Sequence, residues 1–247
     1  MPAKVVIIAA LEREVRVLVR GSEWRRSNAI AVPYGVFESD SAVVVCAGIG
    51  AEPARRAAQA ALEGFRPPAL VSAGLAGALT GEYRVGDVIC PATILDAQGA
   101  AISATIEIAA CNRRGVLVSS PVVAGRANKR SLAERYGADI VDMEAAAVAQ
   151  VAAQHEVPFV AIKAVSDELD FPMPDTTAFV DAQGRFLTGR FLLHTCVRPA
   201  TWSVVSKLAS NSAKASRELC RVLRTWFATN QAGLLLRSET KREQLQP

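Results

Sequence analysis

The segment Val141–Asp170, VDMEAAAVAQVAAQHEVPFVAIKAVSDELD, constrains the fold of this chain most strongly. The pattern predicts a short strand at its start, a helix over Met143–His155 and a buried strand over Pro158–Val165. Glu144 then falls in the first turn of the helix, and Asp167 follows the second strand. Because open α/β sheets bind ligands beyond the carboxyl ends of their strands, we expect these two carboxylates to face one ligand site.

Apolar runs elsewhere in the chain predict further elements of an α/β sheet. We predict strands over Val5–Ala9, Ile30–Phe37, Ser41–Cys46, Ala69–Ala73, Val85–Leu95 and Gly115–Ser119, and a hairpin around Gly99. We predict helices over Leu11–Val19, Pro53–Glu63, Asn128–Tyr136, Phe179–Leu193 and Pro199–Phe227. Small residues predict a turn at Gly74–Leu79, and prolines predict an irregular loop at Phe171–Asp175.

Size and composition suit one domain with a large core. The chain has 247 residues, of which 51% are hydrophobic, so we expect a single α/β domain with a central mixed, twisted sheet flanked by helices. We place this domain at residues 1–228 and a polar C-terminal tail at 229–247. The formal net charge of +4 is modest and long basic runs are missing, so the sequence does not predict a nucleic-acid partner.

The cysteines and histidines bear on compartment and metal content. The cysteines are odd in number, widely spaced and without a CxxC pair, which is typical of reduced thiols in the cytoplasm. They are Cys46, Cys90, Cys111, Cys196 and Cys220. Two histidines are too few for the usual Cys/His zinc site, so we expect neither a metal nor another cofactor. The apolar start VVIIAAL is too short for a signal peptide or a membrane span.

The polar residues also have structural explanations. From its position alone, Asp167 could cap the following segment or pair with Lys163. Glu144 could simply stabilise a helix N-terminus. Glu14 could be an exposed helix residue paired with a neighbouring arginine. The scattered basic residues are expected on solvated helix faces, although one could meet a phosphate or an anionic substrate. They are Arg55, Arg56, Arg113, Arg114, Arg126, Lys129 and Arg130.

A glycine pair after the predicted strand Ser41–Cys46 invites comparison with dinucleotide-binding loops. Gly48-Ile49-Gly50 lacks the third glycine of GxGxxG and has Pro53 in its place. A dinucleotide-dependent oxidoreductase is therefore not favoured.

Six short motifs occur in an order that carries a family resemblance. AALEREV, AGIG, GLAGAL, RVGDVI, VDMEA and KAVSD resemble the nucleoside phosphorylase superfamily, particularly its methylthioadenosine/S-adenosylhomocysteine nucleosidases. The resemblance covers roughly residues 4–168, and VDMEAAA with AVSD is its most specific part. Residues 171–247 do not resemble the nucleosidases closely. They are more similar to hopanoid-associated and other bacterial phosphorylase-like proteins.

The resemblance implies roles for three carboxylates. Asp167 would donate the proton that lets a purine leave as a neutral base. Glu144 would accept hydrogen bonds from the ribose hydroxyls, and Glu14 would orient the attacking water. The other residues implied around the nucleoside are Ile49, Leu75, Ala76, Gly77, Val123, Asp142, Met143 and Ser166.

Several positions depart from the nucleosidase pattern. Asp142 replaces a common glutamate, Leu75 a serine, and Lys163 an arginine near the acid. Val122 and Val123 fall where an aromatic side chain usually lies against the purine, so stacking would be weaker. These differences leave the identity of the base and of the 5′ substituent open.

The sequence therefore predicts a cofactor-free enzyme that cleaves the N-glycosidic bond of a purine nucleoside with water. A carboxylate at Glu14 would repel phosphate, which favours hydrolysis. A phosphate-dependent phosphorylase, including one for a hopanoid-type substrate, and a non-catalytic nucleoside-binding protein remain alternatives. The resemblance also implies a homodimer without a membrane span.

Overall fold

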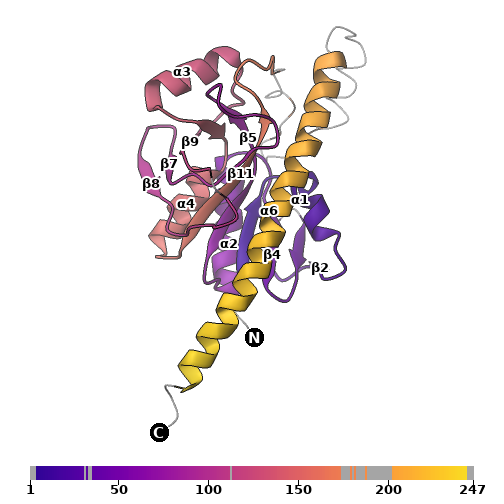
Figure 1. Ribbon diagram of the computed structural model, residues 1–247, viewed down its shortest axis with the longest axis vertical. Coiled ribbons are helices and arrows are strands. Elements are labelled where there is room, and N and C mark those ends of the chain that lie inside the picture. The colour runs from indigo at the N-terminus through magenta and orange to yellow at the C-terminus, as the bar shows by residue number, and fades with distance from the viewer. Residues whose placement is uncertain are drawn as a thin grey trace.

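The computed structural model describes residues 4–30, 32, 35–111, 113–173, 179, 181, 187 and 202–243, with side chains of the last helix described as far as residue 228. Within these residues, eleven strands form one mixed sheet with helices on both faces (Figure 1). The strands are β1 Val5–Ala9, β2 Arg25–Ser27, β3 Val36–Glu38, β4 Ala42–Cys46, β5 Leu70–Ala78, β6 Val88–Ile89, β7 Thr93–Leu95, β8 Ala101–Ser103, β9 Val116–Ser119, β10 Ile140–Asp142 and β11 Phe159–Asp167. The helices are α1 Glu12–Val19, α2 Ala51–Phe65, α3 Arg126–Tyr136, α4 Ala145–Gln154 and α6 Trp202–Glu243. The predicted fold class is confirmed.

Strand β5 is the centre of the sheet. One of its edges pairs in parallel with β11 along most of its length. The other edge pairs in parallel with β1 at residues 70–72, and antiparallel with β10 at residues 77–78. The carboxyl ends of β1 and β10 therefore point toward each other across residues 73–76 of β5. This opposition brings the chain after β1 and the chain after β10 to one place.

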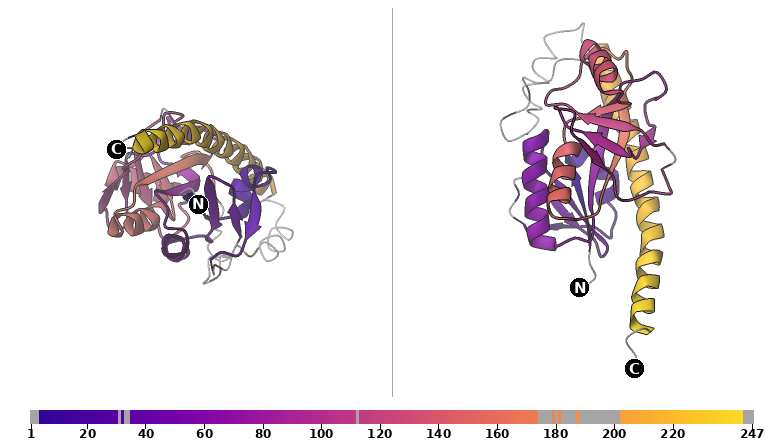
Figure 2. Two further views of the ribbon diagram at one scale, coloured as in Figure 1. Left: turned by 90° about the horizontal axis from the view of Figure 1, so that it is seen from below. Right: turned by 90° about the vertical axis from the view of Figure 1, so that its left-hand side faces the viewer.

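Two layers of helices bury the two faces of the sheet (Figure 2). Alternate residues of β11 enter different cores: Ala161 and Val165 lie with α2 and α4, whereas Ile162 and Ala164 lie with α1 and α6. Helices α2 and α4 contact each other mainly through alanines, which allow their backbones to approach closely. Packing in these two cores fixes the positions of the strands, and therefore of the residues at the strand ends.

The last helix is longer than the predicted helix. It packs against β11 and α1 through buried residues that include Ala215, Leu219 and Leu223, and it continues to Glu243 (Figure 1). The predicted boundary between domain and tail thus falls inside α6, and that division stays a prediction. No helix among the described residues is both long and apolar enough to cross a bilayer.

Other elements correct the predictions. The small-residue segment Gly74–Leu79 is not a turn, because β5 continues through Ala78. The predicted strand Val85–Leu95 is two strands, β6 and β7, which pair with different partners. Strand β2 was not predicted.

The hairpin around Gly99 is confirmed: β7 pairs antiparallel with β8, and Gly99 has a φ of +89°. The predicted helix over Asn128–Tyr136 is α3, and Gly137 ends it in the left-handed conformation. Apart from Phe179, Asp181 and Leu187, the predicted helix Phe179–Leu193 lies outside the described residues.

Candidate active site

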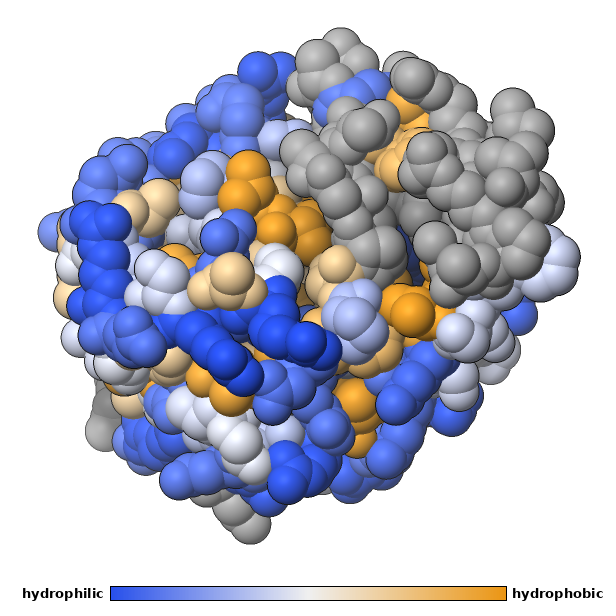
Figure 3. Space-filling model, turned by 90° about the horizontal axis from the view of Figure 1, so that it is seen from above, coloured by the Kyte–Doolittle hydropathy of each residue, from blue (hydrophilic) through white to orange (hydrophobic). Residues whose placement is uncertain are grey.

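A cavity of about 600 Å³ opens where the chain leaves β1, β10 and β11. Every residue that the sequence assigned to the site lines it: Glu14, Ile49, Leu75, Ala76, Gly77, Val123, Asp142, Met143, Glu144, Ser166 and Asp167. On the upper end of the molecule, apolar side chains gather near the middle of the face (Figure 3). A volume of this size suits a small-molecule ligand.

Asp167 is the last residue of β11 and is buried. Its Oδ1 lies 2.7 Å from the hydroxyl of Ser166, and its Oδ2 accepts from the ammonium of Lys129 in a buried ion pair. The alternative pairing of Asp167 with Lys163 is therefore wrong. The expectation that Lys129 lies on a solvated helix face is also wrong, because its side chain is fully buried.

Gly77 leaves the space that this ion pair occupies. A Cβ at residue 77 would lie 2.9 Å from Asp167 Oδ2 and 3.0 Å from Lys129 Cε. Both distances are shorter than ordinary van der Waals contact. A glycine in β5 is thus required by the charged pair beside it rather than by a turn.

Lys163 lies in the other charged cluster of the site. Its ammonium is 2.8 Å from Asp142 Oδ2 and 3.0 Å from the hydroxyl of Ser72. Burial acts to lower the pKa of Lys163, but Asp142 and Glu144 outweigh it, so the pKa is raised. Lys163 therefore interacts with Asp142 and the carboxylates around it, and not with Asp167, the predicted acid.

Asp142 is held by the protein at both oxygens. Oδ1 accepts from the Ser119 hydroxyl at 2.6 Å, and Oδ2 accepts from the backbone N–H of Ala145 at 2.9 Å as well as from Lys163. The side chain of Asp142 thus accepts from the first backbone N–H of helix α4. This network leaves Asp142 tied to the protein rather than directed at a ligand.

Glu144 is the residue that precedes α4, and not part of its first turn as predicted. Its Oε1 accepts from the backbone N–H of Gly50 at 2.7 Å, and the side chain lines the cavity. Burial raises its pKa to about 7; repulsion from Asp142 adds to this, and Lys163 opposes it. Glu144 can therefore change its charge near neutral pH.

Glu14 is buried on α1, so the alternative of an exposed helix glutamate is wrong. Its Oε2 has no hydrogen-bond partner among the described residues. Burial raises its pKa, although Lys163 acts against this. Gly74 makes room here, because a Cβ at residue 74 would lie 3.2 Å from Glu14 Oε2 and 3.6 Å from Lys163 Nζ.

Helix α6 adds a wall that sequence reasoning missed. The spacing of its cavity residues is helical, so they form one stripe facing the site. They are Val205, Leu208, Ala209, Ser212, Ala213 and Ser216. Because the sequence does not show which side of a helix meets a distant cavity, no motif could have identified them. In the described part of the chain, no cluster of three or more His, Cys, Asp or Glu side chains could hold a metal ion.

Comparison with known proteins places the chain in a family. Residues 4–108 and 113–188, more than half of the chain, match the model of the phosphorylase superfamily. The 5′-methylthioadenosine/S-adenosylhomocysteine nucleosidase of Bacillus cereus (strain G9842) is 27% identical over 197 residues, covering 66% of this chain and 85% of that protein.

Solved structures share the fold. The apo 5′-methylthioadenosine nucleosidase of Arabidopsis thaliana superposes with a TM-score of 0.69 at 18% identity, covering 90% of this chain and 95% of that one. The MTA/SAH nucleosidase of Streptococcus pneumoniae in complex with 8-aminoadenine also has a TM-score of 0.69 at 18% identity, covering 91% and 98%. The chain belongs to the phosphorylase superfamily.

Proposed function

We propose that this protein hydrolyses the N-glycosidic bond of a purine nucleoside of the 5′-methylthioadenosine or S-adenosylhomocysteine kind. The observation that carries the proposal is the meeting of Glu14, Glu144 and Asp167, from three separate elements, around one cavity. The names of the similar proteins point to the same reaction.

The reaction assigns each carboxylate to one part of the substrate. The oxygen of water bonds to C1′ while the bond from C1′ to the purine nitrogen breaks and its electron pair leaves with the base. Asp167 protonates the base at N7, and Glu14 accepts the proton of the water. Glu144 accepts hydrogen bonds from the ribose hydroxyls and favours the positive charge that develops on the sugar.

The raised pKa of Glu14 supports its role as the base. A general base works best when its pKa approaches the operating pH. Its Oε2 is also left free by the described part of the protein, whereas both Asp142 oxygens are occupied. A water molecule beside Glu14 would supply the missing partner.

The wall formed by α6 supports an apolar 5′ substituent. Val205, Leu208 and Ala209 line the cavity, and the family match ends before this helix. We therefore expect alkylthio groups at the 5′ carbon to be preferred over charged ones. Turnover of adenosines with methylthio, butylthio and homocysteinyl groups tests this order, which equal efficiency for all three would contradict.

The main rival is phosphorolysis, which Arg13 and Arg16 at the cavity favour because guanidinium groups bind phosphate. Base release with and without inorganic phosphate separates the two reactions. Our proposal requires free ribose as the product and the same rate in both conditions. Ribose 1-phosphate would establish the rival, and tight binding without turnover would indicate a binding protein.

Assembly and compartment are further parts of the proposal. From the resemblance to nucleosidases we expect a homodimer in the cytoplasm. The described cysteines, Cys46, Cys90, Cys111 and Cys220, are free thiols, which is usual in a reducing compartment; Cys196 lies outside the described residues. Sedimentation of the purified protein measures the oligomeric state, and a monomer would contradict this expectation.

A further inference from the structure

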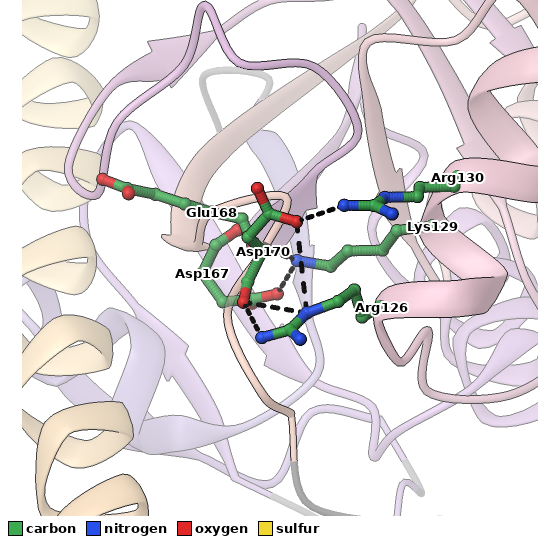
Figure 4. A network of polar contacts seen from close by, with 6 residues as sticks. All are labelled: Arg126, Lys129, Arg130, Asp167, Glu168 and Asp170. Atoms are coloured by element: carbon green, nitrogen blue, oxygen red, sulfur yellow. Dashed lines mark hydrogen bonds and ion pairs between the residues drawn. The ribbon is translucent and has the colours of Figure 1, made fainter.

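Helix α3 holds the segment that follows β11 (Figure 4). Arg126 donates to the carbonyl oxygen of Asp170 at 2.6 Å, and Arg130 donates to its carboxylate at 2.8 Å. Lys129, about one turn after Arg126 and next to Arg130 in the chain, reaches further inward to Asp167. All of α3 is described, and Lys129 is its one buried residue.

All the donors of Lys129 are used by the protein. Its ammonium contacts Asp167 Oδ2, the carbonyl oxygen of Asp167 at 3.3 Å and the carbonyl oxygen of Glu168 at 2.7 Å. An ammonium has three N–H donors, so none is left for a substrate. Lys129 therefore acts on the reaction only through Asp167.

Both oxygens of Asp167 accept hydrogen bonds in this arrangement, one from Ser166 and one from Lys129. A carboxylate that accepts at both oxygens has no proton of its own to give. The acid proposed for the reaction must therefore first receive a proton. The ammonium of Lys129 is already in contact with Oδ2, and Lys129 is one of the residues that line the same cavity.

We propose that Lys129 is a positioning residue that holds Asp167 in place and supplies the proton that Asp167 passes to the leaving base. This inference rests on the proposed function. One N–H bond of Lys129 breaks as an O–H bond forms at Asp167, and that carboxyl then gives one proton to N7. Asp167 ends as a carboxylate and Lys129 as a neutral amine, which regains its proton from water that enters the cavity once the products have left.

The backbone supports this pair independently. Gly77 lies against both members, and any larger residue would contact Asp167 Oδ2 and Lys129 Cε at 3.0 Å or less. The strand thus leaves room for the ion pair at the place where β5 and β11 end. An incidental surface contact would not require such a space.

Two substrates and two variants test the inference. The first substrate is the purine nucleoside with the highest kcat/KM. The second is a 4-nitrophenyl β-riboside with the same 5′ group, whose leaving group departs without protonation. We expect Lys129→Met to lower kcat for the purine about 100-fold, at least ten times more than for the nitrophenyl riboside. KM should change less than kcat, since no N–H donor of Lys129 is left for the substrate. Arg130→Met is the matched control, because it loosens the same segment at Asp170 only, and it should keep the wild-type ratio of the two rates.

Lys129→Arg separates charge from proton supply, and serves if Lys129→Met does not fold. A guanidinium keeps the positive charge but does not give up its proton. We expect it to lower the purine rate selectively. Full purine activity in Lys129→Arg, equal losses on both substrates, or the same selective loss in Arg130→Met would overturn the inference while the proposed function stood. A wild-type protein that released no base from any nucleoside would refute the proposed function itself.

Discussion

The two buried charged clusters beside β5 differ in their balance of acid and base. Near Gly74, Lys163 lies among three carboxylates, those of Glu14, Asp142 and Glu144. Near Gly77, Lys129 pairs with the single carboxylate of Asp167. The first cluster has surplus negative charge, and burial raises the pKa of two of its carboxyl groups. The second is matched and fully hydrogen-bonded.

This difference indicates that the two clusters act on different parts of one substrate. A surplus of buried carboxylates favours groups that accept protons and stabilise positive charge, as the water and the sugar require. A matched ion pair instead holds one proton at a defined position, as the departing base requires. The surplus of negative charge should also lower the free energy of unfolding, whereas the matched pair should lower it only when one of the two partners is removed.

The largest effect is expected from breaking the matched pair. Asp167→Asn should reduce purine release about 1,000-fold, because the acid is lost. It should also lower the free energy of unfolding by about 3 kcal/mol, since the ammonium of Lys129 stays buried without its carboxylate. Urea unfolding and base release measure the two effects.

The double variant Lys129→Met/Asp167→Asn sharpens this result. It removes both charges, so most of the lost stability should return while the activity stays low. If activity returned with stability, the pair would be structural and Asp167 would not be the acid. If Asp167→Asn alone were as stable as the wild type, the pair would contribute little.

The surplus cluster should respond differently. Glu14→Gln should lower kcat about 100-fold or more with little change in KM, because the attacking water loses its base. The loss should be equal for the purine nucleoside and the nitrophenyl riboside, since both need the water. Selective loss on the purine would instead assign Glu14 to the leaving base and remove the contrast between the clusters.

The titration of Glu144 should make the stability of the protein depend on pH. Its pKa is raised from 4.5 to about 7, so the folded protein binds more protons than the unfolded chain between these values. Its contribution to stability is present below pH 4.5 and is lost as the pH rises through 7. A rise in pKa from 4.5 to about 7 corresponds to about 3 kcal/mol. Glu144→Gln should therefore be more stable than the wild type at pH 8 by up to about 3 kcal/mol, and close to it at pH 4.

Substrate binding should follow the opposite trend. The ionised carboxylate of Glu144 accepts ribose hydrogen bonds better, so KM of the wild type should fall several-fold from pH 6 to pH 8. The Gln variant should bind weakly at both values. A KM that does not change with pH in the wild type would show that Glu144 does not titrate in this range.

The sequence predicts the carboxylates of the site better than their partners. Asp167 and Glu144 lie within three residues of the end of an apolar run, and an apolar run that forms a buried strand places the polar residues that follow it at the sheet edge. Lys129 lies on a polar helix with little amphipathic character, and its burial depends on a segment 38 residues away. No local pattern distinguishes it from the exposed Arg130.

The strand β5 shows the same limit. Its second half, Gly74–Ala78, consists of glycines and alanines apart from Leu75, and its glycines favour turns, yet β11 pairs with it and holds it extended. The opposition of β1 and β10 along its other edge depends on β10 being antiparallel, which the apolar pattern does not indicate. The fold class and the meeting of the carboxylates were therefore accessible from the sequence, whereas the pairing of Lys129 with Asp167 and of Lys163 with Asp142 was not.

The smallest effects compare the two glycines that make room for the clusters. Gly77→Ala places a Cβ 2.9 Å from Asp167 Oδ2, which Lys129 holds in place, and should lower the free energy of unfolding by about 2 kcal/mol. Gly74→Ala places a Cβ 3.2 Å from Glu14 Oε2, which no described residue holds, and should lower it by less than about 1 kcal/mol. Urea unfolding of both variants measures the difference.

Gly77→Ala should also reduce the rate on the purine relative to the nitrophenyl riboside, whereas Gly74→Ala should affect both substrates alike. Equal losses of stability, with equal effects on both substrates, would show that the side chains of the two clusters adjust equally well to an added methyl group. The contrast between the matched pair as a fixed proton donor and the surplus cluster as a proton acceptor would then be wrong.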